Sequence, residues 1–240
     1  KSEKSVNGTK ICRFAQSKDG TKPILPSILE ELLAARKATR KQAESQDDPF
    51  MANILDKRQL GYKVTANSLY GQCGAKTSTM YEVDVAAATT ATGRKLLTYA
   101  RRIVEEVYGN TEVEVKVKSD SGSVETVKVM SRAEYVYGDT DSVFFTFNLQ
   151  TMEGKPIVGK RALEMSIELG QQVGELASRY LKAPHAWAYE KTMMPFFLLR
   201  KKGYIGMLYE KNPNKGKRKS MGIVLKRRDN APIVKDIYGG

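Results

Sequence analysis

The 240 residues, of which 41% are hydrophobic, are enough to build a sizeable core and exclude an intrinsically disordered chain. No run approaches the roughly 20 consecutive apolar residues that span a bilayer, and the polar N-terminal residues lack a signal-peptide core, so we expect no membrane partner. The 40 basic residues against 27 acidic ones give a net charge of +13, which is typical of a protein with a polyanionic partner such as nucleic acid; a solvated basic surface is the alternative.

Two helices are predicted in the first third of the chain. Pro26 suits a first helical turn, and apolar residues recur after it at helical spacing. Pro49 interrupts this pattern because it lacks the amide that a helix interior requires. A second helix is expected from about Asn53 to Leu69 and ends near Gly71. The two helices are therefore expected to form a hairpin.

The rest of the chain alternates predicted strands and helices, which indicates an α+β class. In chain order we expect a helix over 84–108, a β-hairpin over 111–130, a hairpin over 134–147, a helix over 160–181, and strands over 194–210 and 220–228. The hairpin near 111–130 carries no recognisable chemistry and is interpreted as a surface insertion. A basic loop, 211–220, joins the last strands, and its residues from Lys215 to Lys219 either track duplex phosphates or form a plain exposed loop.

The segment YVYGDTDSVFFTF places Asp139 and Asp141 between residues that favour burial. Two carboxylates about 6 Å apart repel each other by roughly 3 kcal/mol at an effective dielectric constant of about 20. A cation would relieve this repulsion, and carboxylate oxygens together with water and phosphate suit Mg²⁺. An ordinary acidic β-turn is the alternative.

The segment KVTANSLYG places Lys63, Asn67 and Tyr70 on one face of the second predicted helix. This face offers a cation for a triphosphate and an aromatic ring for a base or sugar. Gly71 follows, and the lack of a Cβ there would allow a ligand to approach closely.

The first predicted helix carries Arg36 and Arg40 one turn apart. Such a basic run is usually a solvated helix face. Across a helical hairpin from Lys63, however, the two guanidinium groups would bind the negative charge of a nucleotide.

Four segments, in this order, resemble the polymerase motifs of the family B DNA polymerases: LDKRQLGYKVTANSLYG, YGDTDSVF, RKKGYIG and GIVLKRRDNAP. That family includes eukaryotic replicative polymerases alpha and delta, and the wording here looks most like the enzymes of large nucleocytoplasmic DNA viruses. The resemblance implies an antiparallel palm sheet with packed helices and an inserted two-helix fingers hairpin. It divides the chain into a palm segment or linker (1–22), fingers (23–74), palm (75–228) and the start of a thumb (229–240).

The resemblance also implies the catalytic and metal-binding residues. Asp141 matches the ligand of both catalytic Mg²⁺ ions, and Asp139 matches the neighbouring acid. Lys63 matches the fingers lysine that touches the triphosphate of the incoming deoxynucleotide. Asn67 matches a residue near that triphosphate.

Further roles follow from the same resemblance. Arg36 and Arg40 fall where a fingers helix binds phosphate, and Tyr70 and Gly71 match the pocket of the nascent base pair. A primer-holding KKxY element matches Lys201, Lys202 and Tyr204, although Gly203 stands where a bulkier basic residue is common, and Arg227 and Arg228 match an element near the DNA.

The implied activity is template-directed DNA synthesis. The alternative is a non-catalytic nucleic-acid-binding protein with this fold. A further DxxSLYPS motif of the family, which supplies the other metal-binding aspartate, does not occur in the sequence. We therefore expect a fragment that is inactive by itself. The implied partners are primer–template DNA, deoxynucleoside triphosphates and a sliding clamp or other replication proteins, in the host nucleus or a cytoplasmic virus factory.

Overall fold

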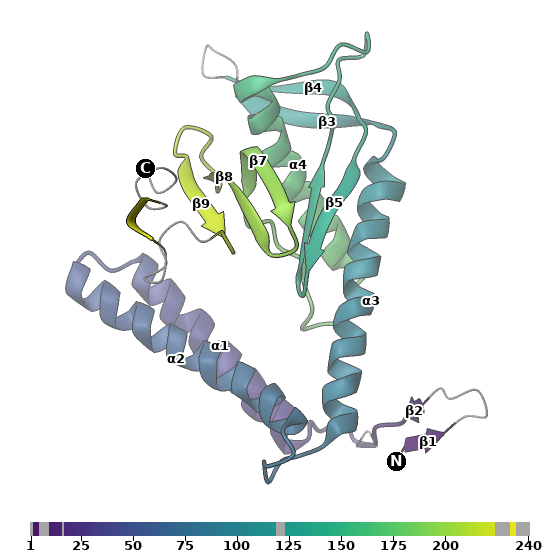
Figure 1. Ribbon diagram of the computed structural model, residues 1–240, viewed down its shortest axis with the longest axis vertical. Coiled ribbons are helices and arrows are strands. Elements are labelled where there is room, and N and C mark those ends of the chain that lie inside the picture. Colours follow the sequence, from purple (N-terminus) through teal and green to yellow (C-terminus); the bar gives the residue numbers. More distant parts are fainter. Residues whose placement is uncertain (1, 5–9, 16, 119–122, 224–230, 234–240) are drawn as a thin grey trace. The chain divides into compact units, whose positions relative to one another are not determined.

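The computed structural model describes residues 2–4, 10–15, 17–118, 123–223 and 231–233 (Figure 1). Contacts divide the chain into two compact units, Lys1–Gly93 and Arg94–Gly240. The elements are β1 (Ser2–Lys4), β2 (Lys10–Cys12), α1 (Ile24–Glu44), α2 (Pro49–Gly74), α3 (Val83–Tyr108), β3 (Thr111–Lys118), β4 (Val124–Ser131), β5 (Glu134–Asp139), β6 (Ser142–Thr146), α4 (Gly159–Arg179), β7 (Thr192–Arg200), β8 (Gly203–Tyr209) and β9 (Lys217–Met221).

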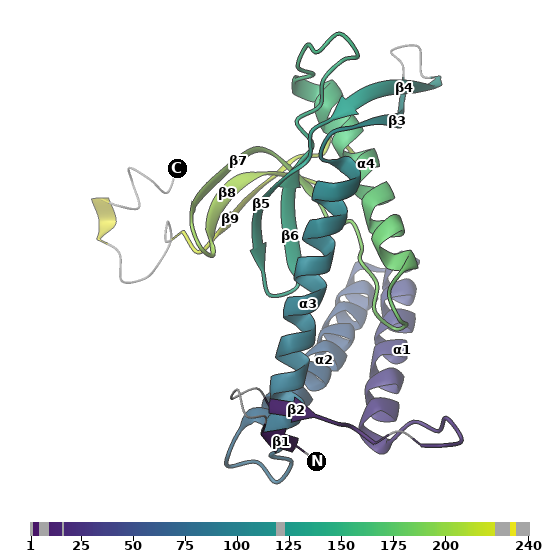
Figure 2. The ribbon, with the colours of Figure 1, turned by 90° about the vertical axis from the view of Figure 1, so that its right-hand side faces the viewer.

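The first unit is built around the antiparallel helices α1 and α2, which lie side by side in both views (Figures 1 and 2). Their less exposed residues recur at alternating intervals of three and four, the spacing that keeps one seam facing a partner helix. These positions are Leu25, Leu29, Leu32, Arg36, Thr39 and Ala43 in α1, and Ala52, Leu55, Gln59, Tyr62, Ala66, Leu69 and Cys73 in α2. The predicted helical hairpin is therefore confirmed.

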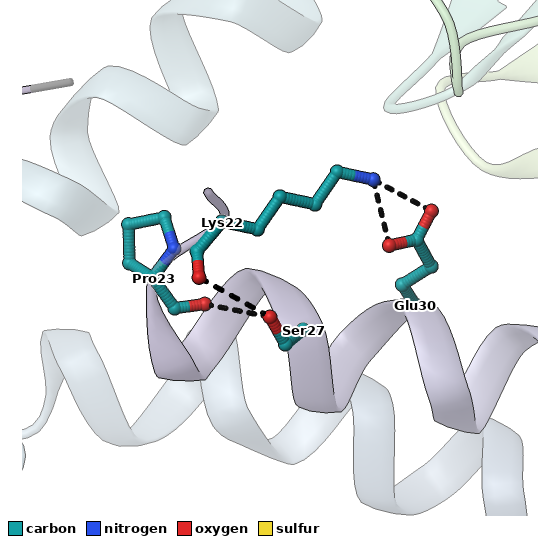
Figure 3. Close-up of polar contacts among 4 residues, drawn as sticks. All are labelled: Lys22, Pro23, Ser27 and Glu30. Carbon is teal, nitrogen blue, oxygen red and sulfur yellow. Dashed lines mark hydrogen bonds and ion pairs between the residues drawn. The ribbon is translucent and has the colours of Figure 1, made fainter. Parts of the chain in front are cut away.

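The start of α1 is held by side chains that reach across its first turns (Figure 3). Lys22 Nζ lies 2.6 Å from both Glu30 carboxylate oxygens, and Ser27 Oγ donates to the Pro23 carbonyl at 3.1 Å. Both partners of the ion pair are exposed, so the pair contributes little stability.

Helix α2 begins at Pro49, four residues before the expected start at Asn53. Proline is compatible with the first helical position because the amide there has no partner within the helix. The Asp48 side chain accepts a hydrogen bond from the Phe50 amide at 3.0 Å and caps this end. At the other end, Gly71 does not break the helix, which continues to Gly74.

The second unit has its hydrophobic core where α3, the β3–β4 hairpin and α4 meet. The core consists of Val104, Tyr108, Val115, Val117, Val129, Ala133, Phe147, Leu149, Met165, Leu169 and Val173. Three hairpin valines are among them, and Val115 is completely buried. The interpretation of this hairpin as a surface element is therefore wrong. One hairpin face closes the core, while the other carries charge pairs such as Lys128 with Glu112 at 2.8 Å.

Two further sheets of the second unit lie next to each other (Figure 2). Strands β5 and β6 form an antiparallel hairpin, and β7, β8 and β9 form an antiparallel sheet in that order. The expected basic loop is shorter than predicted because Lys217–Met221 is strand β9, paired with β8. The expected strand over 220–228 lies largely outside the described residues.

The mixture of helices and antiparallel sheets confirms the predicted α+β class. Among the described residues, no helix combines the length and apolar character needed to cross a membrane.

Candidate functional site

The acidic segment forms the tight turn between β5 and β6. The Asp141 amide donates to the Asp139 carbonyl at 2.6 Å across Thr140, which has a φ of 54°. A hydrogen bond between residues two apart, around a residue with positive φ, defines the rarer and more strained form of γ-turn. The turn leaves the Asp141 side chain exposed and Asp139 partly exposed.

The conformation of Thr140 is unfavourable for a β-branched residue. Backbone in such a region costs about 1–3 kcal/mol and persists where the surroundings enforce it, often at functional sites. Two side-chain hydrogen bonds support the turn: Thr140 Oγ1 donates to the Asp139 carboxylate at 3.1 Å, and Ser142 Oγ donates to the Asp139 carbonyl at 3.1 Å. This strained turn is more specific than an ordinary acidic loop and favours a functional role for its carboxylates.

Lys202, in the turn between β7 and β8, connects the acidic turn to the basic segment predicted to hold a primer. Its ammonium group lies 3.5 Å from the Asp139 carboxylate, and its backbone amide donates to the Tyr137 hydroxyl at 2.8 Å. Lys202 also has a positive φ of 60°. The Lys202 charge therefore offsets part of the repulsion between the two aspartates.

Four aromatic rings pack between the β5–β6 hairpin and the β7–β8 strands. The Phe144 ring lies 5.7 Å from that of Phe196, 5.3 Å from that of Tyr204 and 5.7 Å from that of Tyr137. Such contacts are worth more than their buried area alone. These ring contacts fix the acidic turn relative to Lys201, Lys202 and Tyr204, the three residues that match the primer-holding element.

Glycine at position 138 lets the chain pass closely under an aromatic residue just before the acidic turn. A Cβ there would lie 2.8 Å from the Tyr135 hydroxyl oxygen. The ring of Tyr135 is covered on one face by the Arg101 guanidinium, 4.7 Å from its centroid. The strand that leads into the acidic turn is therefore held against α3.

The acidic turn supplies two carboxylates, Asp139 and Asp141, as possible ligands of a divalent cation. Hard oxygen ligands suit the predicted Mg²⁺, which keeps several water molecules and binds through one or two carboxylates together with substrate phosphates. Within the described residues, no group of three or more His, Cys, Asp or Glu side chains is arranged to hold a metal ion. The donor set thus fits an ion whose remaining ligands come from water and phosphate.

The predicted nucleotide-binding residues of α2 share one exposed face of the helix. At roughly 100° per residue, Lys63, Asn67 and Tyr70 fall within an arc of about 60°. All three are exposed, whereas the residues that face α1 are not. The Tyr70 hydroxyl is hydrogen-bonded to Thr90 Oγ1 of α3 at 2.7 Å, so the ring has a fixed orientation.

Arg36 and Arg40 have different surroundings although they lie one turn apart. Arg36 Nε donates to Gln59 Oε1 at 3.2 Å, which makes a polar contact in the α1–α2 seam. Gln59 precedes Lys63 by one helical turn, so Arg36 lies near the predicted triphosphate-binding lysine. Arg40 is exposed, one turn closer to the end of the helical hairpin.

The predicted residues therefore form two groups, one in each unit. The α1–α2 group contains Arg36, Arg40, Lys63, Asn67, Tyr70 and Gly71, and the second group contains Asp139, Asp141, Lys201, Lys202 and Tyr204. Arg227 and Arg228 lie outside the described residues.

Sequence reasoning missed Tyr137 and Thr90, which hold predicted site residues in place. The alternation of a β-strand places Tyr137 on the same face as Asp139, and this was a usable signal. The contact with the Lys202 amide joins residues 65 positions apart, and no local pattern predicts it.

Comparison with known proteins matches DNA polymerase family B over residues 2–239. A DNA polymerase of Phaeocystis pouchetii virus is 56% identical over 81% of this chain and 18% of its own length. A DNA polymerase of Pyramimonas orientalis virus is 41% identical over 96% of this chain and 21% of its own length.

A eukaryotic relative extends the match: the DNA polymerase delta catalytic subunit of Drosophila melanogaster is 34% identical over 89% of this chain and 17% of its own length. The chain spans about a fifth of the length of these curated relatives. The match covers both the helical unit with Lys63 and the unit with the acidic turn. This chain belongs to DNA polymerase family B.

Proposed function

We propose that this chain is the fingers and most of the palm of a template-directed DNA polymerase, which adds deoxynucleotides to a primer 3′-hydroxyl. The observation that carries the proposal is the strained acidic turn, with Asp141 exposed and Asp139 joined by Lys202 to the basic β7–β8 turn. Family membership gives this arrangement its chemical meaning.

The acidic turn holds the catalytic metals in this proposal. Two Mg²⁺ ions, when bound, supply activation of the 3′-hydroxyl and stabilisation of the leaving pyrophosphate. Asp141, exposed at the end of the γ-turn, would bind both ions, and Asp139 would bind or orient a ligand beside them. Because Lys202 already contacts Asp139, the two carboxylates are expected to have different roles.

The exposed face of α2 binds the incoming nucleotide. Lys63 carries a full positive charge for the triphosphate, and the Asn67 amide donates hydrogen bonds to it. Tyr70, whose hydroxyl is held by Thr90, offers a ring of fixed orientation to the base or sugar. Arg36 and Arg40 add positive charge along the same hairpin, and the Gln59 contact limits the freedom of Arg36.

The β7–β8 turn holds the primer terminus. Lys201 and Lys202 are exposed and basic, and the Tyr204 ring is anchored in the aromatic cluster. Contacts of this kind position DNA without reading its sequence. We also assign DNA contact to Arg227 and Arg228, and a sliding clamp or other replication proteins as partners, on the family resemblance alone.

A non-catalytic nucleic-acid-binding protein is the second candidate. The net charge of +13 favours it, because positive charge alone supports DNA binding without any chemistry. The two candidates differ in what Asp141 does.

The test is primer extension with a matched primer–template, four deoxynucleoside triphosphates and Mg²⁺. It compares this chain with a longer polymerase chain that includes the upstream segment expected to carry DxxSLYPS. We expect extension by the longer chain only, since the missing motif supplies the other metal-binding aspartate. Robust synthesis by the present chain alone contradicts the expected inactivity of the fragment.

The sharper variant is Asp141→Asn in the longer chain. We expect a loss of about 10²- to 10³-fold in rate, because metal-assisted charge stabilisation is worth several kcal/mol and each 1.36 kcal/mol is tenfold. Asp47→Asn, at an exposed aspartate before α2, is the matched control and is expected to retain the rate. Equal rates for the two variants would contradict the metal-binding role of Asp141. No synthesis by the longer chain, with salt-sensitive DNA binding intact, would support the binding-protein candidate instead.

A further inference from the structure

The segment from Arg200 to Met221 is strongly basic. It contains eight lysine or arginine residues and a single acidic residue, Glu210. The lysines and the arginine of β9, Lys217, Arg218 and Lys219, are all exposed. The structure changes the meaning of this charge, because these three residues lie in an ordered antiparallel strand and not in a loop.

The register of β9 separates its basic residues onto two faces. Lys219 is paired with Gly206 and Lys217 with Leu208, while Arg218 is paired with Met207. Directly paired residues of neighbouring strands project from the same face, and successive residues alternate between faces. Lys217 and Lys219 therefore lie on the face that also carries Tyr204, and Arg218 lies on the opposite face.

The Tyr204 face is the side of the sheet that packs against the acidic hairpin. Tyr204 and Phe196 contact Phe144 of β6 on this side, with ring centroids 5.3 and 5.7 Å away. Gly206, between them and Lys219, has no side chain to cover the surface. A Cβ at Gly206 would lie 2.5 Å from the Pro195 carbonyl oxygen, so only glycine fits beside the β7 backbone at this position.

The end of β9 is tied to the turn that carries Lys201 and Lys202. Gly222 has a φ of 61°, and a Cβ there would overlap the Lys202 carbonyl oxygen. Arg200 Nη2 also donates to the Gly222 carbonyl at 3.5 Å. Lys219 lies three residues, or about 10 Å, before Gly222, and Lys217 lies about 6.8 Å further along the strand, away from the acidic turn.

We propose that Lys217 and Lys219 of β9 contact the sugar–phosphate backbone of duplex DNA and continue the contact made by the β7–β8 turn. This inference rests on the proposed function, because the primer terminus sets where the duplex begins. A step of about 6.8 Å equals the axial rise of about two nucleotides of one strand, at about 3.4 Å each. In this proposal β9 runs along the duplex, so that the two ammonium groups contact phosphates of a single DNA strand.

Lysines on an edge strand also have a purely structural use. Strand β9 is the last strand of its sheet, and charged side chains on such a strand prevent pairing with other chains. If this were their only role, removal of the lysines would promote self-association and leave DNA binding unchanged. The two roles therefore give opposite results in one experiment.

The experiment measures the binding of a fluorescent primer–template duplex to the present chain by anisotropy, between about 50 and 200 mM salt. Lys217→Ser and Lys219→Ser are each expected to weaken binding and reduce the slope of log affinity against log salt by about 1. Arg218→Ser removes the same charge from the same strand on the other face and is the matched control. It is expected to retain the slope of the unchanged chain.

Three results would overturn the inference: equal effects of all three substitutions, unchanged slopes with increased self-association in sedimentation, or no duplex binding by the unchanged chain. None of them bears on catalysis, which Asp141→Asn tests separately in the longer chain. If the longer chain makes no product while substitution of the β9 lysines still reduces the slope, the proposed function fails and the β9 contact stands as DNA binding alone.

Discussion

Gly71 occupies a position in α2 where the fold itself would accept an alanine. A Cβ there meets no atom within 4 Å, and the residue lies inside a helix, where glycine is less favourable than alanine by roughly 0.5–1 kcal/mol. We therefore expect Gly71→Ala to leave the fold as stable or more stable. If the α2 face binds the nascent base pair, the same change should reduce the rate of nucleotide insertion by the longer polymerase chain about tenfold or more, because a methyl group then occupies the approach to Tyr70.

Gly61→Ala is the matched control for this prediction. Gly61 lies in the same helix, also has open space around its Cβ position, and points away from the Lys63 face by the helical spacing. Both variants should show a similar rise in melting temperature, while only Gly71→Ala slows insertion. Equal insertion rates for the two variants would show that Gly71 has no role in the pocket.

At the scale of elements, Gly170 shows how α4 meets the segment that follows it. A Cβ at Gly170 would lie 2.6 Å from Cδ2 of Tyr189. The ring cannot move away easily, because the Tyr189 hydroxyl is hydrogen-bonded to Thr192 Oγ1 at 2.9 Å and to the Glu210 carbonyl oxygen at 2.7 Å. Gly170→Ala is therefore expected to lower the free energy of unfolding by about 1–3 kcal/mol in urea denaturation.

Gly93→Ala provides the comparison for that measurement. Gly93 lies inside α3 with no atom within 4 Å of its Cβ position, so alanine should raise stability by roughly 0.5–1 kcal/mol. The two substitutions are chemically identical, and only their surroundings predict opposite signs. Stabilisation by both would mean that the contact of α4 with Tyr189 is looser than the structure indicates.

The elements that sequence reasoning placed well are those with a strong local period. The apolar residues of α1 recur with a 3.6-residue period, and those of β3 and β4 alternate with polar ones. Both patterns are local in the sequence, and the structure confirms these elements. The start of α2 was misplaced because a proline read as a helix breaker is equally suited to the first helical position after Asp48. The core role of the β3–β4 hairpin was missed because burial depends on α4, whose partner strand no local pattern identifies.

The candidate site divides in the same way. Helical spacing alone placed Lys63, Asn67 and Tyr70 on one face of α2, and the structure has them exposed there. No local pattern predicts the ion pair between Asp139 and Lys202. It joins two turns 63 residues apart, which the packing of aromatic rings brings together. Motif resemblance grouped these turns functionally, but only the folded chain shows which atoms connect them.

At the scale of the whole molecule, burial is unequal between the two units. The largest fully buried side chains, among them Met165, Leu169 and Val115, belong to the second unit. Among the described residues of the first unit, the buried ones are Thr39 and Cys73, while Phe50 remains 69% exposed. Helices with few buried apolar contacts open more readily, because tertiary packing supplies most of their stability.

We therefore expect amide hydrogen exchange in α1 and α2 to be faster than in α4 and the β3–β4 hairpin of the same chain. Each fully buried aliphatic side chain contributes about 1.5–3 kcal/mol, so a difference of only two such residues corresponds to about a hundredfold or more in exchange rate. Mass spectrometry of peptides from 24–74 and 111–177 measures both regions in one sample.

Equal protection would mean that another surface covers the helical hairpin, and loss of that protection on dilution would identify the surface as a second copy of the chain. Faster exchange, retained on dilution and reduced by a deoxynucleoside triphosphate, would instead connect the low stability of the hairpin with the binding of substrate, because a ligand that binds the closed helices must suppress their opening.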